Sequence, residues 1–234
     1  MTRPHPAVAV IGAGISGLAA ARALRADTRV TLFEAGDYFG GHAHTVEVEL
    51  PVAAGRPPVR HGVDTGFLVY NDRTYPQLIR LFADLGVETA ASEMSFSVQA
   101  PRRGGRTLEW SGDNLDTVFA QRRNLLDPRF LGMLRDLLRF NKLTTRIADA
   151  GTENELAQPL GAFLDEHRFG APFRDWYFLP MMGCIWSCPT RQMLEFPVAT
   201  MIRFCHNHGL IRISNRPQWH TVRGGSREYV RRVL

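Results

Sequence analysis

The sequence predicts an α/β fold that begins with a strand–helix–strand unit and continues into a mixed, largely helical second part. Residues 7–33 contain two short apolar runs rich in branched side chains, separated by a glycine-rich turn and a run of helix formers. Apolar residues then recur at helical spacing in segments that begin near 74 and 127. The chain has 234 residues, 44% of them hydrophobic, which is enough apolar material for a buried core.

The glycine-rich turn has the spacing of a dinucleotide-binding fingerprint. Gly12-Ala-Gly14-Ile-Ser-Gly17 follows the predicted strand Ala7–Ile11 and precedes the predicted helix. The first glycine permits a tight turn, the second lets a pyrophosphate approach the backbone, and the third lets the helix pack closely on the strand. The helix N-terminus offers N–H groups and partial positive charge to the phosphates. This segment therefore predicts a Rossmann-type nucleotide site.

Glu34 stands at the end of the second predicted strand, Arg29–Phe33, about 20 residues after Gly14. A carboxylate at this point accepts hydrogen bonds from the ribose hydroxyls. Its charge repels a 2′-phosphate, which disfavours NADP. Because FAD and NAD both carry an ADP half, the strand–helix–strand unit does not distinguish between them.

The residues after Glu34 favour FAD. The segment Glu34-Ala-Gly-Asp-Tyr-Phe-Gly40-Gly41-His42-Ala-His-Thr45 resembles flavoproteins of the amine oxidase and phytoene desaturase superfamily. In that superfamily the paired glycines bring backbone close to the pyrophosphate and ribityl chain, and His42 here replaces an arginine that often follows them. Further motifs are similar to a bacterial family of NAD/FAD-binding oxidoreductases within that superfamily, namely Val63–Asn71, Arg73–Pro76, Met94–Val98, Ile185–Ser187, Asn207–Leu210 and Pro217–Val230.

The resemblance implies FAD as the cofactor and a set of residues that contact it. These residues are Gly12, Ala13, Gly14, Ile15, Ser16, Gly17, Glu34, Ala35, Gly40, Gly41, His42, Thr45 and Gly66. Gly66 either lets backbone approach the flavin ring or marks a bulge, and both interpretations stay open. Phe67 and Trp186 are candidates for the wall of a substrate pocket, although aromatic residues such as those before Trp186 are also typical of a core.

The resemblance also implies a domain organisation. Residues 1–70 form the first part of the FAD-binding domain, 71–205 form a substrate domain, and 206–234 return to the FAD domain. The fold class is therefore a Rossmann-type βαβ start plus a mixed, largely helical substrate domain, an incomplete amine-oxidase-like fold. Because the superfamily uses further strands and a second flavin contact, we expect the N-terminal portion of a longer protein. Alone, this portion is expected to bind FAD weakly or not at all.

The hydrophobic pattern predicts the elements between these landmarks. Thr74 is expected to cap a helix that Gly86 ends, and Asp127 to precede a longer helix that buries Leu131, Leu134, Leu137 and Leu138. Strands or extended segments are expected at 46–50, 59–70, 96–100, 106–110, 211–214 and 218–222. Residues 150–205 are expected to be mostly helical, with a break at Pro197.

No catalytic residue is identified, because flavin chemistry needs no triad and the cofactor itself carries the reaction. His208 and His220 are candidates for a general base, but hydrogen-bonding structural roles are more typical of such histidines. Cys184, Cys188 and Cys205, with the histidines after Cys205, do not have the spacing of a standard zinc site. We therefore expect no metal.

The charge distribution and the cysteines bear on partners and compartment. The net charge is +5, and residues 201–234 hold seven arginines and one acid, which we expect to face an acidic partner or an anionic cofactor. Without a lysine and arginine run, nucleic-acid binding is not expected. No apolar run reaches the roughly 18 residues of a membrane helix, while transient contact with a membrane surface stays open. Three cysteines do not suit a secreted disulfide scaffold, so a cytoplasmic location is expected.

Together these inferences predict an FAD-dependent oxidoreductase that oxidises or desaturates a largely apolar small molecule or lipid by hydride transfer to flavin. Some members of the bacterial family are linked to modification of fatty acyl chains, which suggests such a chain as substrate. Two alternatives stay open. One is an NAD-dependent dehydrogenase or a mutase-like dinucleotide-binding protein, and the other is a non-catalytic, truncated flavin-binding module.

Overall fold

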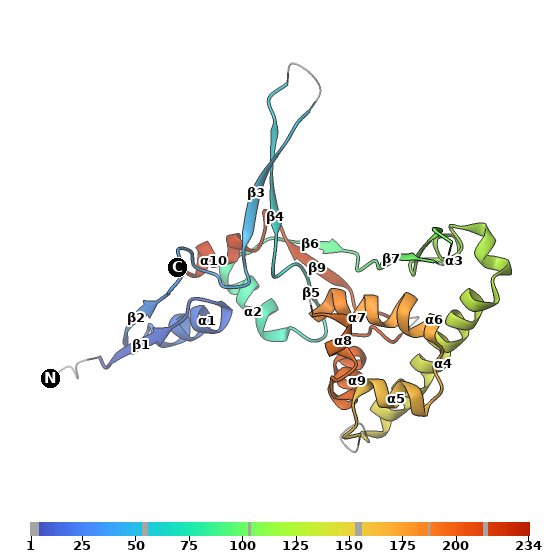
Figure 1. The fold of residues 1–234 in the computed structure, drawn as a ribbon. Helices are drawn as coiled ribbons and strands as arrows, with labels where there is room; N and C mark the ends of the chain where they lie inside the picture. The colour runs from blue at the N-terminus through green and yellow to red at the C-terminus, as the bar shows by residue number, and fades with distance from the viewer. Residues whose placement is uncertain (1–4, 53–55, 103, 153–155, 187, 213–214) are drawn as a thin grey trace. The chain divides into compact units, whose positions relative to one another are not determined.

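The computed structural model describes residues 5–52, 56–102, 104–152, 156–186, 188–212 and 215–234. The chain divides into two compact units (Figure 1). Unit 1 comprises Met1–Glu93 and Gln218–Leu234, and unit 2 comprises Met94–Pro217. Each unit is described by itself.

Unit 1 begins with the predicted strand–helix–strand. Strand β1 (Ala7–Ile11) pairs in parallel with β2 (Arg29–Phe33), in a register that runs from Ala7 opposite Arg29 to Ile11 opposite Phe33. Helix α1 (Ile15–Leu24) connects them and buries Leu18. The parallel pair and its connecting helix confirm the βαβ prediction.

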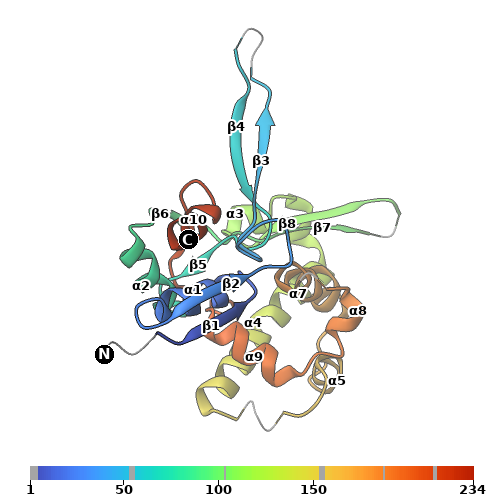
Figure 2. The same cartoon turned by 90° about the vertical axis from the view of Figure 1, so that its left-hand side faces the viewer.

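A long hairpin follows. Strands β3 (Thr45–Leu50) and β4 (Val59–Asp64) are antiparallel, and they project from the rest of unit 1 in Figures 1 and 2. The register places Thr45 opposite Asp64, so these two residues share the inner end of the hairpin. The predicted extended segment 59–70 is therefore interrupted, because β4 ends at Asp64 and the next strand, β5 (Tyr70–Asn71), belongs to another sheet.

That sheet joins distant parts of the sequence. Its order is β5–β9–β6, with β6 (Thr89–Ser92) and β9 (Trp219–Val222) antiparallel, so the returning strand β9 is the central one. Helix α2 (Pro76–Leu85) packs against α10 (Arg227–Val233). Gly86 ends α2 in the left-handed conformation, as predicted, but Tyr75 occupies the N-cap position. The predicted Thr74 cap is wrong, because the Thr74 hydroxyl donates to Asn71 Oδ1 instead, 3.0 Å away.

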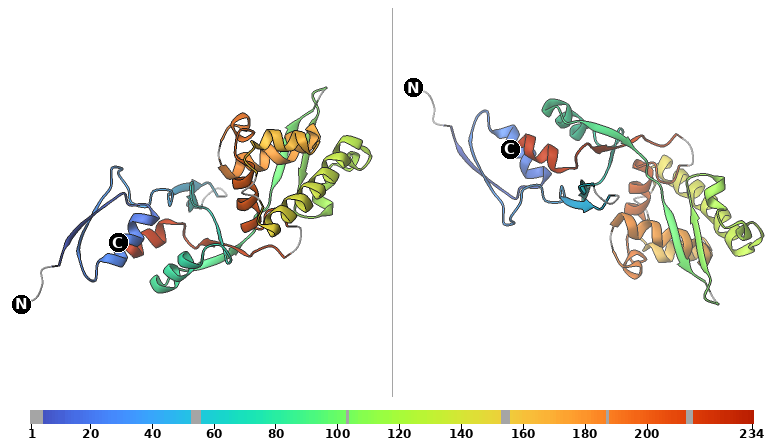
Figure 3. Two further views of the ribbon diagram at one scale, coloured as in Figure 1. Left: turned by 90° about the horizontal axis from the view of Figure 1, so that it is seen from below. Right: turned by 90° about the horizontal axis from the view of Figure 1, so that it is seen from above.

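Unit 2 is a helical assembly with one hairpin (Figure 3). Strands β7 (Ser97–Pro101) and β8 (Thr107–Ser111) are antiparallel, which confirms the predicted hairpin. The helical elements are α3 (Leu115–Val118), the 3-10 turn η1 (Arg122–Leu126), α4 (Pro128–Ala150), α5 (Leu160–Glu166), α6 (Ala171–Phe173), the π-helical turn η3 (Arg174–Phe178), α7 (Leu179–Trp186), α8 (Thr190–Met193) and α9 (Val198–Asn207). Five phenylalanines are fully buried in the core of this unit, namely Phe130, Phe140, Phe163, Phe173 and Phe178.

The long helix α4 begins as predicted, but its buried face matches the prediction only in part. Asp127 caps it, since its Oδ1 accepts hydrogen bonds from the N–H groups of Arg129 and Phe130. Leu131 and Leu138 are exposed, so the prediction that they are buried is wrong. Leu134 and Leu137 are partly buried and pack against the core, as predicted in part. The fully buried positions are Phe130, Met133, Asp136, Phe140, Asn141 and Thr144. Phe140 lies among the rings of Phe169, Phe173 and Phe178, which hold this side of the helix inward.

One further expectation differs from the structure. The predicted strand at 211–214 does not form at its first two residues, because Ile211 lies in a turn that the Arg212 N–H closes by donating to Gly209 O, 3.3 Å away; Ile213 and Ser214 lie outside the described residues.

The two units divide after Glu93 and before Gln218, and the predicted domain limits after residues 70 and 205 stay predictions. Helix α2 and strand β6 pair and pack with the return segment, which places them in unit 1. The proposed roles of the segments stay predictions.

Several arginines near the C-terminus contact their own unit. Arg227 forms an ion pair with Glu47, at 2.8 Å between Nη2 and Oε1, and Arg231 pairs with Glu228. Arg232 donates to the carbonyl oxygens of Leu85 and Gly86, at the C-terminal end of α2. These three arginines therefore have partners within their own unit, and the expectation that the tail arginines face an acidic partner or an anionic cofactor stays a prediction. Among the described residues, no helix combines the length and apolar character needed to cross a bilayer.

Candidate dinucleotide site

The glycine turn after β1 adopts the geometry that its sequence predicts. Gly12 has φ = 93°, a left-handed conformation that favours glycine, and its N–H donates to Phe33 O at the end of β2, 2.7 Å away. Gly17 lies against this turn, since a Cβ there would stand 1.8 Å from Gly12 O. The third glycine of the fingerprint is thus required for close packing of α1 on the turn.

Gly14 has a different environment. It is the N-cap of α1 with φ = −69°, which any residue can adopt, and no described atom lies within 4 Å of the place where its Cβ would be. The open position at Gly14 is therefore a cradle that a side chain would fill. The adjoining residues Ile15 and Ser16 start the helix and are exposed. Their N–H groups belong to the first turn of α1, where no intrahelical acceptor exists.

Glu34 reaches back to the turn from the end of β2. Its Oε2 accepts a hydrogen bond from Ala13 N at 2.7 Å, and its Oε1 accepts one from Gly36 N at 2.9 Å. These bonds, that from Gly36 first and that from Ala13 second, lower the pKa of the Glu34 carboxyl below its usual value, with a smaller contribution from the backbone of Ala35. The group is therefore a carboxylate at neutral pH. Each oxygen has lone pairs left for ribose hydroxyls.

The glycine pair lies directly over the fingerprint. Gly40 donates from its N–H to Ala13 O at 2.9 Å and forms an isolated parallel bridge with Gly14. Gly41 has φ = 59°, and a Cβ on it would lie 3.1 Å from Gly14 Cα. The structure thus brings the two glycine motifs, separate in the sequence, into backbone contact at Gly14.

The remaining predicted residues lie at the inner end of the hairpin, with His42 and Thr45 at its start and Gly66 just after its end. His42 is exposed, and its carbonyl oxygen accepts from Phe67 N at 2.7 Å. A Cβ on Gly66 would be 2.4 Å from that same His42 oxygen, so the close backbone approach that Gly66 permits is to His42. The Thr45 hydroxyl donates to Asp64 Oδ1 at 2.5 Å. Contacts of His42, Thr45 and Gly66 with a cofactor stay predictions.

The sequence did not predict that Asp64 and Ser226 meet. Asp64 accepts hydrogen bonds from both the N–H and the hydroxyl of Ser226, across 162 residues of sequence. Both residues stand in motifs that carried the family resemblance, Val63–Asn71 and Pro217–Val230. The motifs signalled that the residues matter, but a carboxylate can accept from many donors, and nothing local identifies its partner.

The candidate substrate-pocket residues fall in different units. Phe67 is half-buried in unit 1 beside Tyr229, at 6.3 Å between ring centroids. Trp186 ends α7 in unit 2 and packs on Phe196 and Phe204, at 5.3 and 4.6 Å. Packing of this kind is typical of a core. A substrate contact of either residue stays a prediction.

The histidines and cysteines have structural surroundings. His208 stacks on Phe204, and His220 stacks on Tyr70. Cys205 is fully buried beside Met201, and burial raises the pKa of its thiol to about 12. Among the described residues, no group of three or more His, Cys, Asp and Glu side chains is arranged to hold a metal ion.

Comparisons with known proteins agree with this geometry. Residues 10–85 match a family described as an NAD(P)-binding Rossmann-like domain. Polyamine oxidase 5 of Oryza sativa subsp. japonica is 45% identical over 78 residues, which are 32% of this chain and 14% of that protein. Cyclohexylamine oxidase from Brevibacterium oxydans IH-35A has a similar fold, with a TM-score of 0.62 and 22% identity over 98% of this chain and 49% of its own. The fold of this chain is therefore similar to about half of an amine oxidase structure.

A protein whose name indicates a different reaction also has a similar fold. A fatty acid isomerase from P. acnes, described as producing CLA, matches with a TM-score of 0.52 and 16% identity, over 100% of this chain and 50% of its own. The chain therefore spans about half the length of the solved structures it matches. The predicted resemblance to the amine oxidase superfamily is confirmed, whereas membership of the narrower bacterial family stays a prediction.

Proposed function

We propose that this chain holds the ADP half of FAD at the glycine turn and Glu34, as part of an FAD-dependent oxidoreductase. The observation that carries the proposal is the convergence of two segments, the end of β2 and the glycine pair, on Ala13 and Gly14. Glu34 bonds to Ala13 N, Gly40 bonds to Ala13 O, and Gly41 lies against Gly14. The cradle at Gly14 fits a pyrophosphate, because phosphate oxygens can approach bare backbone N–H groups at the start of α1.

The glycine pair is the reason to prefer FAD to NAD. The βαβ unit alone suits either dinucleotide, but a second glycine segment in backbone contact with Gly14 adds another surface beside the pyrophosphate. The similarity to proteins named as amine oxidases supports the same choice. An NAD-dependent dehydrogenase is the competing outcome of the test below.

In this proposal each residue has a defined task. Gly14 leaves space for the pyrophosphate, the first turn of α1 donates N–H groups to it, and Glu34 accepts from the ribose hydroxyls. Bound FAD would supply the acceptor for the hydride that leaves the substrate. The negative Glu34 carboxylate would disfavour a 2′-phosphate.

The substrate and the compartment are part of the proposal. We propose a small, largely apolar substrate that is oxidised or desaturated, with apolar amines and fatty acyl chains as the two classes to test. The cyclohexylamine oxidase and the fatty acid isomerase that share the fold support these classes. The three cysteines are free thiols, which suits a cytoplasmic location.

The site can be tested by titrating the isotope-labelled chain with FAD, ADP and NAD while recording amide NMR shifts. FAD and ADP should shift the amides of Gly12–Gly17, and FAD should bind more tightly than NAD. Gly14→Ala should fold normally and lose these shifts, because its Cβ meets open space in the protein but occupies the cradle. Gly132→Ala, where a Cβ in α4 also meets open space, is the matched control and should bind like the wild type.

Three results would overturn the proposal. FAD at millimolar concentration could leave the glycine turn unshifted in the complete enzyme as well as in this chain, NAD could bind more tightly than FAD, or Gly14→Ala could bind FAD unchanged. The second result would assign the site to a dehydrogenase. The substrate classes are then separated by supplying cyclohexylamine or an unsaturated fatty acid to the complete FAD-loaded enzyme and following the bleaching of its visible absorbance.

A further inference from the structure

The Asp64 carboxylate accepts hydrogen bonds from two parts of unit 1 that are far apart in the sequence. It accepts from the Thr45 hydroxyl at 2.5 Å, from Ser226 N at 2.9 and 3.0 Å, and from the Ser226 hydroxyl at 2.7 Å. Ser226 is fully buried. Hydrogen bonds to an ionised acceptor are stronger than neutral ones, so this group ties the inner end of the β3–β4 hairpin to the start of α10.

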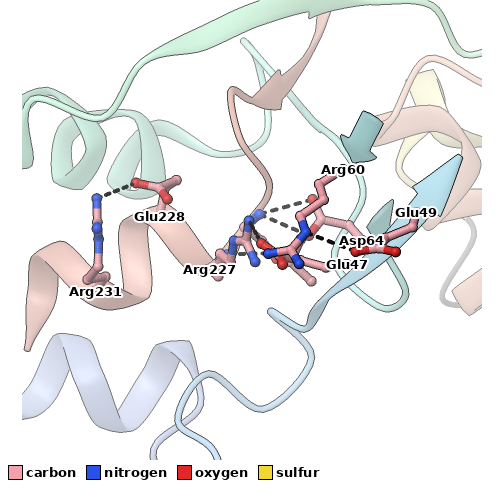
Figure 4. Close-up of polar contacts among 9 residues, drawn as sticks. Glu47, Glu49, Arg60, Asp64, Arg227, Glu228 and Arg231 are labelled. Atoms are coloured by element: carbon pink, nitrogen blue, oxygen red, sulfur yellow. Dashed lines mark hydrogen bonds and ion pairs between the residues drawn. The ribbon is translucent and has the colours of Figure 1, made fainter. Parts of the chain in front are cut away.

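Two further contacts extend this tie (Figure 4). Thr45 Oγ1 accepts from Arg227 N at 3.1 Å, and the Arg227 guanidinium pairs with Glu47 on β3 at 2.8 Å. The backbone at Gly225 comes close to Thr45, since a Cβ on Gly225 would stand 2.5 Å from Thr45 Cγ2. The start of α10 is thus held against β3 and β4 by hydrogen bonds, an ion pair and close packing.

Helix α10 contacts the glycine pair through Val230. Val230, one turn after Ser226, is buried, and its Cγ2 would lie 3.1 Å from a Cβ on Gly40. Gly40 is itself buried and bonds to Ala13 O. A continuous line of contacts therefore runs from Asp64 through Ser226, α10 and Val230 to the backbone of Gly40 over the cradle.

We propose that Asp64 is a positioning residue for the dinucleotide loop. By fixing α10 on the hairpin, it seats Val230 behind Gly40, and so sets the place of Gly40 and Gly41 relative to Gly14. This inference rests on the proposed function in one respect, which is that the loop contacts the pyrophosphate of a bound dinucleotide. The coupling between Asp64 and the loop is a property of the protein without ligand.

Asp64→Asn is the direct test. It nearly conserves shape, but it replaces one accepting oxygen with an NH2 group that cannot accept from Ser226 N. In hydrogen exchange of the full chain without ligand, Asp64→Asn should raise exchange at the Gly40 and Ala43 amides about tenfold or more. The β7–β8 amides should not change. Glu49→Gln, which breaks the exposed Glu49–Arg60 pair on the same hairpin, is the control and should leave the loop as in the wild type.

Two milder variants keep the test decisive if Asp64→Asn does not fold. Ser226→Ala removes the hydroxyl bond and keeps the N–H, so it should give a smaller change in the same direction. Val230→Ala leaves Asp64 intact and removes the contact behind Gly40, so it should loosen the loop without affecting the amide of Ser226. Unchanged loop exchange in Val230→Ala, or in an Asp64→Asn protein whose Ser226 amide has loosened, would overturn the proposal.

Ligand affinity separates positioning from general destabilisation. Because the loop meets the pyrophosphate, Asp64→Asn should weaken binding of ADP about tenfold and leave binding of adenosine nearly unchanged. Equal losses for both ligands would contradict the positioning role. If neither ligand binds to the wild-type chain or to the complete enzyme, the proposed function fails, whereas the exchange comparison still decides whether Asp64 controls the loop.

Discussion

The Glu34 carboxylate lies 2.7 Å from the backbone N–H of Ala13 in the protein without ligand. The residue at the end of β2 is therefore already joined to the glycine turn that follows β1. On its opposite side, the carbonyl of Ala13 accepts from Gly40 N at 2.9 Å. Ala13 is fully buried between these two partners, so the turn is held in place before a dinucleotide arrives.

The first prediction concerns the titration of Glu34. Hydrogen bonds from Gly36 and Ala13 lower the pKa of the Glu34 carboxyl in the folded state below its usual value of 4.5. The ionised carboxylate therefore stabilises the folded protein at pH values above 4.5. That contribution is lost as the pH falls through the lowered pKa. An NMR titration of the Glu34 side-chain carbon should therefore give a midpoint below 4.5, and the Ala13 amide should shift with it. A midpoint at or above that value would show that these bonds do not form in solution.

Replacing the charge should change nucleotide preference. Glu34→Gln keeps an acceptor for one donor, but it loses a charged acceptor for the ribose hydroxyls. ADP binding should weaken about tenfold, and the preference for ADP over its 2′-phosphorylated form should shrink. Asp37→Asn removes an acid nearby in the sequence and serves as the control for net charge. A preference that is the same in both variants would contradict the role given to Glu34.

The third prediction concerns Gly17, whose missing Cβ is needed for packing. Gly17→Ala would place a carbon 1.8 Å from Gly12 O, so the turn or the helix must move. Overpacking of this kind costs about 1–3 kcal/mol or more. Urea unfolding should show this loss for Gly17→Ala and none for Gly14→Ala, whose Cβ meets open space. Equal stability of the two variants would contradict the packing described here.

The fourth prediction concerns the buried face of α4. Phe140 is fully buried against Phe169, Phe173 and Phe178, with ring centroids 4.9–5.5 Å away. Phe140→Ala should lower the free energy of unfolding by about 3–5 kcal/mol. Leu138, on the same helix, is 53% exposed, and Leu138→Ala should change that free energy by about 0.5 kcal/mol or less. A larger loss of unfolding free energy for Leu138→Ala than for Phe140→Ala would show that the face with Leu138 is the buried one.

In α4, hydrophobic periodicity predicted the helix but not all of its buried face. Its leucines recur at helical spacing, and that pattern correctly predicted a helix that begins after Asp127. It could not predict which stripe faces inward, because Phe130 and Phe140 offer a second apolar stripe. The choice depends on the aromatic side chains of α6 and η3, which no local pattern pairs with α4.

The site divides in the same way. The sequence by itself determined the βαβ unit, the glycine turn and the placement of Glu34, because these features lie within residues 7–34 and follow from short-range rules of strand, turn and helix. Only the tertiary structure decided that Gly40 and Gly41 lie over Gly14, that β9 returns as the central strand, and that Asp64 holds Ser226. Contacts across 162 residues depend on how whole elements pack, and the identity of one side chain does not specify its distant partner.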